Sequence, residues 1–273
     1  MRQKILIVGA GKWSQKLVSI LNLDEFQIEN IPARNFIENL KFGNSIEFDL
    51  IWICTRPEIQ CEILEFSHLI FGKMILEKPL ALNIESHKNI SEVINRDSRI
   101  FLSCPWASSA LWKRVLELIS QFHFSEIEIK RVGEKAHDYI PSELDWLPHD
   151  ILLLSSIAEY SNSDLEWISI DTTGDEITRC YRMGNVNIKL NFFSSGTRKS
   201  KWTIKSSTGD FVEVDLLQGN IRICYGQKAF EESFENNSNL RNMVNDILNS
   251  RNNFGLRIQL LALESLFRTE PPK

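Results

Sequence analysis

Residues 5–14 read Ile5-Leu6-Ile7-Val8-Gly9-Ala10-Gly11-Lys12-Trp13-Ser14. Four consecutive aliphatic residues are typical of a buried strand in a parallel sheet. The glycines that follow permit a tight turn, and apolar residues at helical spacing continue over 12–23. A strand, a glycine turn and a helix in this order favour a dinucleotide-binding unit, because the helix N-terminus then faces a pyrophosphate.

The turn contains most of the predicted cofactor-binding residues. Gly9 permits the sharp change of direction, and Gly11 lets the backbone approach a pyrophosphate. Lys12 and Trp13 follow, and the Trp13 ring is expected either beneath the pyrophosphate or nicotinamide, or in the core. Ser14 stands at the third glycine position, where it is small but not equivalent. The alternative is an ordinary strand–helix turn without a ligand.

The end of the second predicted strand, 26–31, bears on which dinucleotide binds. An acidic residue about 20 residues after the glycines usually holds the ribose of NAD, and none occupies that position here. Arg34 is instead expected to pair with a 2′-phosphate, which favours NADP over NAD. A surface arginine without a ligand is the alternative, and an inward-facing Glu29 would reverse the preference.

Strands and helices alternate through the first part of the chain. After the first two strands, the expected elements are a helix at 35–40, a strand at 49–54, a helix at 57–69, a strand at 74–76, a helix at 84–94 and a strand at 100–104. This alternation predicts α/β structure, with a Rossmann-like, doubly wound parallel sheet as the dinucleotide-binding domain over residues 1–120.

The remainder, residues 121–273, is expected to form an α+β domain with a large open, mostly antiparallel sheet that serves substrate binding and oligomerisation. Strand-like runs separated by glycine turns fill 165–225. The other expected elements are a helix at 112–122, a strand at 126–132, a helix at 147–159, a polar loop at 231–239 and helices at 240–248 and 256–267.

Composition excludes several classes of protein. Hydrophobic residues make up 43% and charged residues 25% of the 273 residues, which is the balance of a globular protein. The net charge of −5 provides no basic field for nucleic acid. No run approaches the roughly 18 apolar residues of a membrane span. The five dispersed cysteines indicate reduced thiols and a cytoplasmic location. The sequence contains no cluster of Cys and His residues that would indicate a metal site.

A second motif is more specific than the glycine turn. The chain reads Thr55-Arg56-Pro57 after one predicted strand, then Gly72-Lys73, and then Glu77-Lys78-Pro79 after the next. This arrangement resembles the Gfo/Idh/MocA family of oxidoreductases, whose pattern is Thr-Pro-Pro, a helix, Gly-Lys, a strand and Glu-Lys-Pro. The resemblance is strong up to residue 82 and looser over the rest of the chain.

The resemblance implies an NAD(P) cofactor in contact with Thr55, Arg56, Pro57 and Glu77, and a sugar, polyol or nucleotide-linked sugar as the substrate. It also implies a homodimer or homotetramer through the outer face of the open sheet. Four apolar residues are candidates for that face, although the sequence leaves their side open: Phe192, Phe193, Trp202 and Ile204.

The catalytic residues implied by the resemblance are Lys78 and His149. An ammonium group beside the nicotinamide can stabilise developing negative charge on oxygen. His149 is the expected general acid and base, because the pKa of histidine lies near neutral pH. Asp145, four residues earlier, orients the imidazole or binds a substrate hydroxyl. Asp150 binds substrate or caps locally.

Trp106 follows the fifth predicted strand, at the sheet edge where ligands bind in such folds. Its ring is expected to stack on a sugar or a base. The four other histidines are interpreted as structural or solvated: His68, His87, His123 and His137.

The chain departs from the family pattern in several places. Gln60 stands where a histidine is common, Leu147 replaces a glycine or alanine, and the chain is shorter than most members. Two alternatives therefore stay open. One is a C=N or tetrapyrrole reductase on the same fold, and the other is a dinucleotide-binding sensor without turnover.

Overall fold

The computed structural model describes residues 2–21, 25–133, 140–235, 238–250 and 256–268, without the side chains of 256–258. Backbone contacts divide the chain into two compact units. The first unit is Met1–Ser103 with Leu240–Leu256, and the second is Cys104–Asn239 with Arg257–Lys273. The second unit therefore starts before the boundary near 120 that the sequence suggested.

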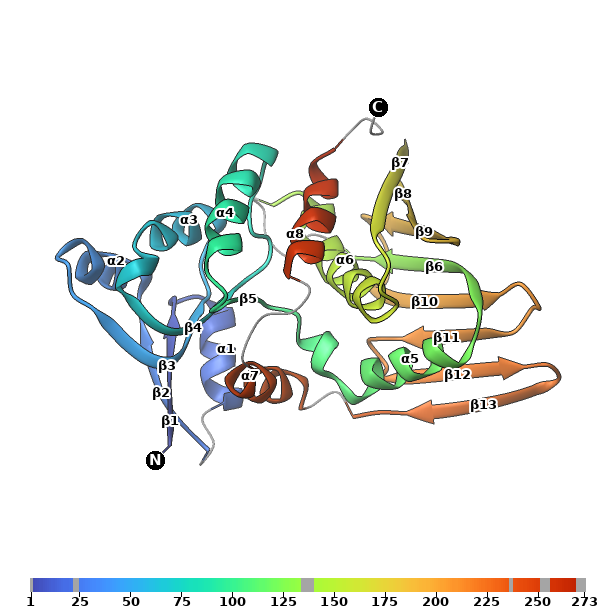
Figure 1. The fold of residues 1–273 in the computed structure, drawn as a ribbon, viewed down its shortest axis with the longest axis horizontal. Helices are drawn as coiled ribbons and strands as arrows, with labels where there is room; N and C mark the ends of the chain where they lie inside the picture. Colours follow the sequence, from blue (N-terminus) through green and yellow to red (C-terminus); the bar gives the residue numbers. More distant parts are fainter. Residues whose placement is uncertain (1, 22–24, 134–139, 236–237, 251–255, 269–273) are drawn as a thin grey trace. The chain divides into compact units, whose positions relative to one another are not determined.

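The first unit contains a five-stranded parallel sheet in the order β2-β1-β3-β4-β5 (Figure 1). Its strands are β1 (Gln3–Val8), β2 (Phe26–Ile31), β3 (Ile46–Ile53), β4 (Ile70–Leu76) and β5 (Ile100–Leu102). The strand order reverses between β1 and β3. In open parallel sheets, the crevice at the carboxyl ends of two such strands is the usual ligand site.

Helices pack on this sheet because their apolar stripes match its buried strands. They are α1 (Lys12–Leu21), α2 (Ala33–Lys41), α3 (Pro57–Glu65), the short η1 (Ser67–Leu69) and α4 (Ile84–Arg96). A further helix, α7 (Asn239–Asn249), comes from the distant end of the chain and lies beside α1 (Figure 1). Met243, Val244 and Ile247 of α7 pack into one core with Leu17 and Trp52.

Lys73 fastens α7 to this unit. Its ammonium group donates to the carbonyl oxygens of Ile247 (2.6 Å) and Leu248 (2.8 Å) and to that of Ser250, at the C-terminal end of the helix. Unpaired carbonyls at a helix C-terminus favour such a cation. The last turn of α7 is thus held by a residue of β4.

The second unit contains an eight-stranded sheet in the order β13-β12-β11-β10-β6-β9-β8-β7. All neighbouring pairs are antiparallel except β6 and β9. Its strands are β6 (Phe124–Val132), β7 (Leu165–Thr173), β8 (Glu176–Met183), β9 (Val186–Phe193), β10 (Lys199–Ser206), β11 (Phe211–Asp215), β12 (Asn220–Tyr225) and β13 (Lys228–Ser233). The predicted fold class, a parallel sheet followed by a large, mostly antiparallel one, is confirmed.

Among its described residues, the second unit has the helical segments η2 (Pro105–Ser108), α5 (Ala110–Gln121), α6 (Ser142–Tyr160), α8 (Leu256–Glu264) and η3 (Ser265–Phe267). Trp112 of α5 meets Trp202 of β10 edge to face, with ring centroids 5.0 Å apart. Because of this packing, α5 belongs with the second sheet. The boundary between the two units therefore lies at residue 104.

The two faces of the second sheet differ sharply. Phe192, Trp202 and Ile204 are buried with the core and do not belong to the open face, which corrects one of the possibilities left by the sequence. Polar residues alternate with them and form ion pairs across strands, such as Lys205 with Glu126 (3.4 Å) and Arg222 with Glu213 (3.4 Å).

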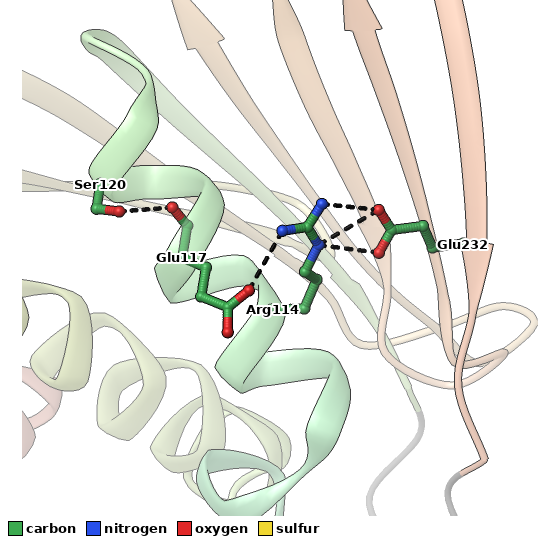
Figure 2. Close-up of polar contacts among 4 residues, drawn as sticks. All are labelled: Arg114, Glu117, Ser120 and Glu232. Carbon is green, nitrogen blue, oxygen red and sulfur yellow. Dashed lines mark hydrogen bonds and ion pairs between the residues drawn. The ribbon is translucent and has the colours of Figure 1, made fainter.

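The edge strand β13 is held by a charged pair (Figure 2). The guanidinium of Arg114 on α5 donates to both carboxylate oxygens of Glu232, at 2.9 and 3.0 Å, and also to Glu117 at 3.2 Å. Bidentate pairing fixes geometry as well as charge. This side chain anchors a strand whose own residues are almost all exposed.

Among the described residues, no helix has both the length and the apolar character needed to cross a bilayer.

Candidate functional site

The glycine turn lies at the end of β1, next to the point where the strand order reverses. Gly9 has φ of +145°, and a Cβ atom there would lie 2.5 Å from the backbone oxygen of Cys54. That distance is well inside van der Waals contact, so only glycine fits. The turn is held by hydrogen bonds from Gly9 N–H to the Ile31 oxygen and from Cys54 N–H to the Val8 oxygen, both 2.8 Å.

Gly11 has a different environment. A Cβ atom at Gly11 would have no atom within 4 Å, so open space adjoins the backbone at this position. Helix α1 begins at Lys12, and its first N–H groups have no partner inside the helix. An accessible backbone beside a helix N-terminus suits a pyrophosphate, because the N–H groups and the helix dipole both favour an anion.

Ser14 takes the third glycine position without disturbing this turn. Its side chain is buried, and its hydroxyl donates to the Gly11 oxygen at 2.8 Å. The serine thus satisfies its own polar group within the turn. Lys12 is exposed on the same turn.

Glu77 joins several elements beneath the turn. Its Oε1 atom accepts hydrogen bonds from Trp13 Nε1 (2.8 Å), Trp52 Nε1 (2.9 Å) and the Ser103 hydroxyl (2.9 Å). Glu77 is 7% exposed, so these contacts hold a buried carboxylate. Glu77 therefore anchors α1 to the ends of β3, β4 and β5, and its predicted cofactor contact stays a prediction.

Trp13 has features of both positions that the sequence left open, a cofactor contact and a place in the core. Its indole N–H is fixed to Glu77, yet 36% of the residue is exposed. The Lys16 ammonium lies 5.6 Å from the ring centroid. The ring is therefore anchored at its polar edge and partly accessible beside the glycine turn.

Lys78 follows β4 and is half-buried, and the Lys78–Pro79 peptide bond is cis. The fully buried Gln60 lies close by. Its Nε2 atom donates to the Glu77 oxygen at 3.0 Å and to the Thr55 oxygen at 3.4 Å. Gln60 therefore ties together the two chain segments that carry the family-like motifs.

Helix α3 begins immediately after the first of these motifs. Pro57 occupies the first helical position, where its fixed φ and missing N–H are well tolerated. Thr55 is half-buried and Arg56 is exposed. Burial, and then the charge of Glu77, raise the pKa of the neighbouring Cys54 thiol, which keeps that thiol neutral.

The end of β2 carries Asn30 rather than an acid. Its Nδ2 atom donates to the Ile7 oxygen (2.9 Å) and to the Gly9 oxygen (2.8 Å), which ties β2 to the glycine turn. Glu29 is exposed. Arg34 lies in the first turn of α2 with 88% of its side chain exposed, and pairs with Glu38 at 3.0 Å.

The second group of predicted residues lies on α6. His149 is half-buried, and Asp145 is 1% exposed four residues earlier, a spacing that puts both on one helix face. Trp146 lies between them in the sequence, and its ring packs against Gly133, where an added Cβ atom would be 3.0 Å away. Pro148 is inside the helix and buried.

Asp150 has a structural position. It is 0% exposed, and its carboxylate accepts from Arg131 Nε (2.7 Å), Arg131 Nη2 (2.5 Å) and Trp202 Nε1 (3.2 Å). The expectation that Asp150 binds substrate is therefore corrected, because the side chain has no exposed surface. It fixes α6 to the middle of the second sheet.

Trp106 lies in η2 and is half-buried. Its backbone oxygen accepts from the Ser109 hydroxyl at 2.6 Å. Of the other histidines, His87 is buried, with Nδ1 3.2 Å from the Ser91 hydroxyl. His68 and His123 are at least partly accessible, and His137 lies outside the described residues.

No protein-family model and no curated protein sequence matches the chain. Solved structures share its fold over nearly its whole length. A Gfo/Idh/MocA family oxidoreductase from Vibrio cholerae is 13% identical, with a TM-score of 0.71 and with 96% of this chain and 95% of that chain covered. UDP-N-acetylglucosamine 3-dehydrogenase GnnA from Acidithiobacillus ferrooxidans is 13% identical, with a TM-score of 0.72 and 97% of each chain covered.

A third structure is a mutant of KijD10, a 3-ketoreductase from Actinomadura kijaniata, in complex with TDP-benzene and NADP. It is 10% identical, with a TM-score of 0.73, and 98% of this chain and 96% of that chain are covered. The chain therefore has the fold found in Gfo/Idh/MocA family oxidoreductase structures, as the motif at residues 77–79 predicted.

Proposed function

We propose that the protein is an NAD(P)-dependent oxidoreductase. It would transfer a hydride between the nicotinamide and a carbinol or carbonyl carbon of a sugar, a polyol or a nucleotide-linked sugar. The observation that carries this proposal is the glycine turn at the strand-order reversal, where position 9 admits only glycine and open space lies beside Gly11. The shared fold with a sugar-nucleotide dehydrogenase and with an NADP-bound ketoreductase supports it.

The residues around the turn fit a dinucleotide. Backbone N–H groups from Gly11 to Ser14 would hold the pyrophosphate at the start of α1. Lys12 would add a positive charge, and the accessible part of the Trp13 ring would line the site. Thr55, Arg56 and Pro57 follow β3 on the other side of the reversal, where the remaining dinucleotide contacts are proposed.

Lys78 and His149 are proposed as the two catalytic residues. A bound NAD(P) supplies or accepts the hydride at its nicotinamide ring. In oxidation, the electron pair of the substrate C–H bond leaves as hydride and the hydroxyl proton passes to His149. In reduction, His149 returns that proton to the oxygen. The Lys78 ammonium would stabilise negative charge that develops on a substrate oxygen.

Asp145 is proposed to orient the His149 imidazole, since the two share a face of α6. Its burial supports a positioning role more than direct substrate binding. Trp106 is proposed to stack on a sugar or a base, because it follows β5 and part of its surface is accessible.

NADP is proposed as the preferred cofactor, because the exposed Arg34 lies just after β2, whose last two residues are Asn30 and Ile31 rather than an acid. The test is a fluorescence titration with NADH and NADPH on the protein and on Arg34→Ala. The variant should weaken NADPH binding about tenfold and leave NADH nearly unchanged. Equal losses for both nucleotides would remove the basis for the preference.

The activity is tested by following NAD(P)H absorbance with a panel of sugars, polyols and nucleotide sugars. Lys78→Ala and His149→Ala should keep cofactor binding while kcat falls at least about a hundredfold, the usual worth of a general acid or base. Full activity in both variants would refute the catalytic assignment. Cofactor binding without any hydride exchange would favour the sensor, and turnover of C=N substrates alone would favour the reductase alternative.

A homodimer or homotetramer in the cytoplasm is proposed as the working state. The odd number and dispersed positions of the five cysteines support a reducing compartment. The open face of the second sheet is rich in cross-strand ion pairs. Light scattering of the purified protein measures the oligomeric state, and a monomer would contradict the proposal.

A further inference from the structure

Arg198 lies in the turn between β9 and β10, where the sequence showed no motif. Its guanidinium carbon is 4.4 Å from the centroid of the Trp146 ring. The turn is folded over the end of β6, since a Cβ atom at Gly196 would lie 3.4 Å from Val132. The Ser194 N–H donates to the Asp175 oxygen at 3.2 Å. Arg198 is thus held by a defined turn.

Trp146 gives this arginine a fixed platform on α6. The indole ring packs against Gly133. Trp146 also precedes His149 by three residues, a spacing that places the two side chains on the same face of a helix. Arg198 is therefore carried on the face of α6 that bears the proposed acid and base.

Arg198 makes its contact with an aromatic ring rather than with a carboxylate. Within the described ranges, no ion pair joins its guanidinium to an acidic side chain. Other arginines of the same sheet are paired, such as Arg131 with the buried Asp150 and Arg182 with Glu166. Arg198 is also exposed, so its donors are accessible to a ligand.

Charges of both signs act on the Arg198 guanidinium. Burial of part of the side chain, and then the charge of Arg131, lower the pKa of Arg198, while the charge of Asp145 raises it by less. Arginine still remains a cation at any physiological pH. An anion would accept charge-assisted hydrogen bonds from the accessible guanidinium.

We infer that Arg198 binds an oxyanion of the substrate, either a carboxylate on the sugar or a phosphate of the nucleotide, beside His149. This inference rests on the proposed function and names its substrate class. A neutral sugar would normally stack its C–H face on an aromatic ring, but here the guanidinium covers the Trp146 ring. Arg198 is then a specificity residue, which selects anionic substrates over neutral ones.

Isothermal titration calorimetry on the full chain tests this without requiring turnover. The probes are two matched pairs, glucuronate with glucose and UDP-glucuronate with UDP-glucose, and also UDP. Arg198→Gln should weaken the anionic probe that binds by about tenfold to a hundredfold. Arg198→Lys should restore part of the affinity, because it keeps the charge and loses the planar fork. Arg182→Gln, an exposed and paired arginine on the same sheet, should stay within about twofold of the wild type.

The probes separate the two sources of the oxyanion. A loss confined to glucuronate and UDP-glucuronate assigns Arg198 to a sugar carboxylate, whereas a loss for UDP and for both UDP-sugars assigns it to phosphate. The inference is overturned if no anionic probe binds the wild-type protein, or if Arg198→Gln and Arg182→Gln lose equal affinity. If neither NADH nor NADPH binds, the proposed oxidoreductase function is refuted. The affinities of the wild type and of the Arg198 and Arg182 variants for the anionic probes can still be compared in that case.

Discussion

At the scale of single residues, the two glycines of the first turn have different tasks. Gly9 is required by the backbone, because φ is +145° and a side chain would meet the Cys54 oxygen at 2.5 Å. Gly11 is required by the proposed ligand, because the space beside it is open. The same substitution at the two positions therefore separates folding from binding.

Gly9→Ala is expected to lower the free energy of unfolding by at least about 1–3 kcal/mol, the cost of a disallowed backbone region. Gly11→Ala is expected to leave stability within about 0.5 kcal/mol and to weaken dinucleotide binding, since its methyl group enters the pyrophosphate space. Urea unfolding and NADPH titration of both variants measure the two effects. If Gly11→Ala binds NADPH as tightly as the wild type, the pyrophosphate does not lie against this turn.

The residues that sequence reasoning found are those whose motif is continuous along the chain. The glycine turn and the motif at 77–79 are local, and both are placed at the strand ends as expected. The partners of Glu77 are not local, because Trp52 and Ser103 lie 25 and 26 residues from it. The substrate-binding role predicted for Asp150 was wrong for the same reason. Its carboxylate is buried against Arg131, which lies 19 residues away along the chain.

At the scale of elements, the buried pair of Arg131 and Asp150 joins α6 to the second sheet. Asp150→Asn would leave the guanidinium of Arg131 without its counter-ion, and we expect the free energy of unfolding to fall by about 3 kcal/mol or more. The double variant Arg131→Met with Asp150→Leu should recover most of that loss, because no buried charge remains. Glu166→Gln, in an exposed pair, should change stability by less than about 1 kcal/mol.

Denaturant unfolding measures all three variants. A stable Asp150→Asn protein with weakened substrate affinity would reinstate the substrate-binding role that the sequence suggested. A double variant as unstable as the single one would show that Asp150 contributes mainly through Trp202, whose indole N–H also donates to it.

The turn before β5 is expected to respond to acid. Burial alone would raise the pKa of Asp97, but hydrogen bonds and charge from Arg99 outweigh it and lower that pKa. A carboxylate with a lowered folded pKa stabilises the protein above its unfolded value of about 4, and this contribution is lost as pH falls through the folded pKa.

Asp97→Asn should therefore destabilise the protein by about 1 kcal/mol at pH 7, and the difference should shrink below about pH 4. Urea midpoints from about pH 2 to pH 7 measure it, with Glu92→Gln in an exposed helical pair as the control. A difference that stays constant with pH would mean that Asp97 acts by geometry alone.

Among the elements, those with clear periodicity were predicted and those without it were not. The four buried residues that end β3 were predicted, but the strand starts at Ile46, where alternate residues are exposed. Strand β13 has no buried residue, and its first residues were not assigned while its last ones were predicted as a loop. It is a strand because it pairs with β12 and because Arg114 holds Glu232 (Figure 2).

At the scale of the whole molecule, each of the two compact units is built from two separate stretches of the chain. The sequence indicated one boundary, since strands and helices alternate in the first part of the chain and strands meander in the second. Nothing in residues 240–248 shows that this amphipathic helix packs on the first sheet, because the apolar stripe of a helix does not identify its partner. The core that joins α7 to the first unit brings Met243, Val244 and Ile247 together with Leu17 and Trp52, from the opposite end of the chain.

A fragment ending at residue 120 is expected to fail as an independent domain, because it lacks α7 and exposes the apolar surface that Met243, Val244 and Ile247 cover. It should bind a hydrophobic dye and unfold without a cooperative transition. Residues 1–103 joined by a flexible glycine–serine linker to residues 239–256 should restore cooperativity, since this fragment contains the whole first unit. Calorimetry and NADPH titration of the two fragments make the comparison. A cooperative transition and full nucleotide affinity in the shorter fragment would show that α7 only covers a domain already complete without it.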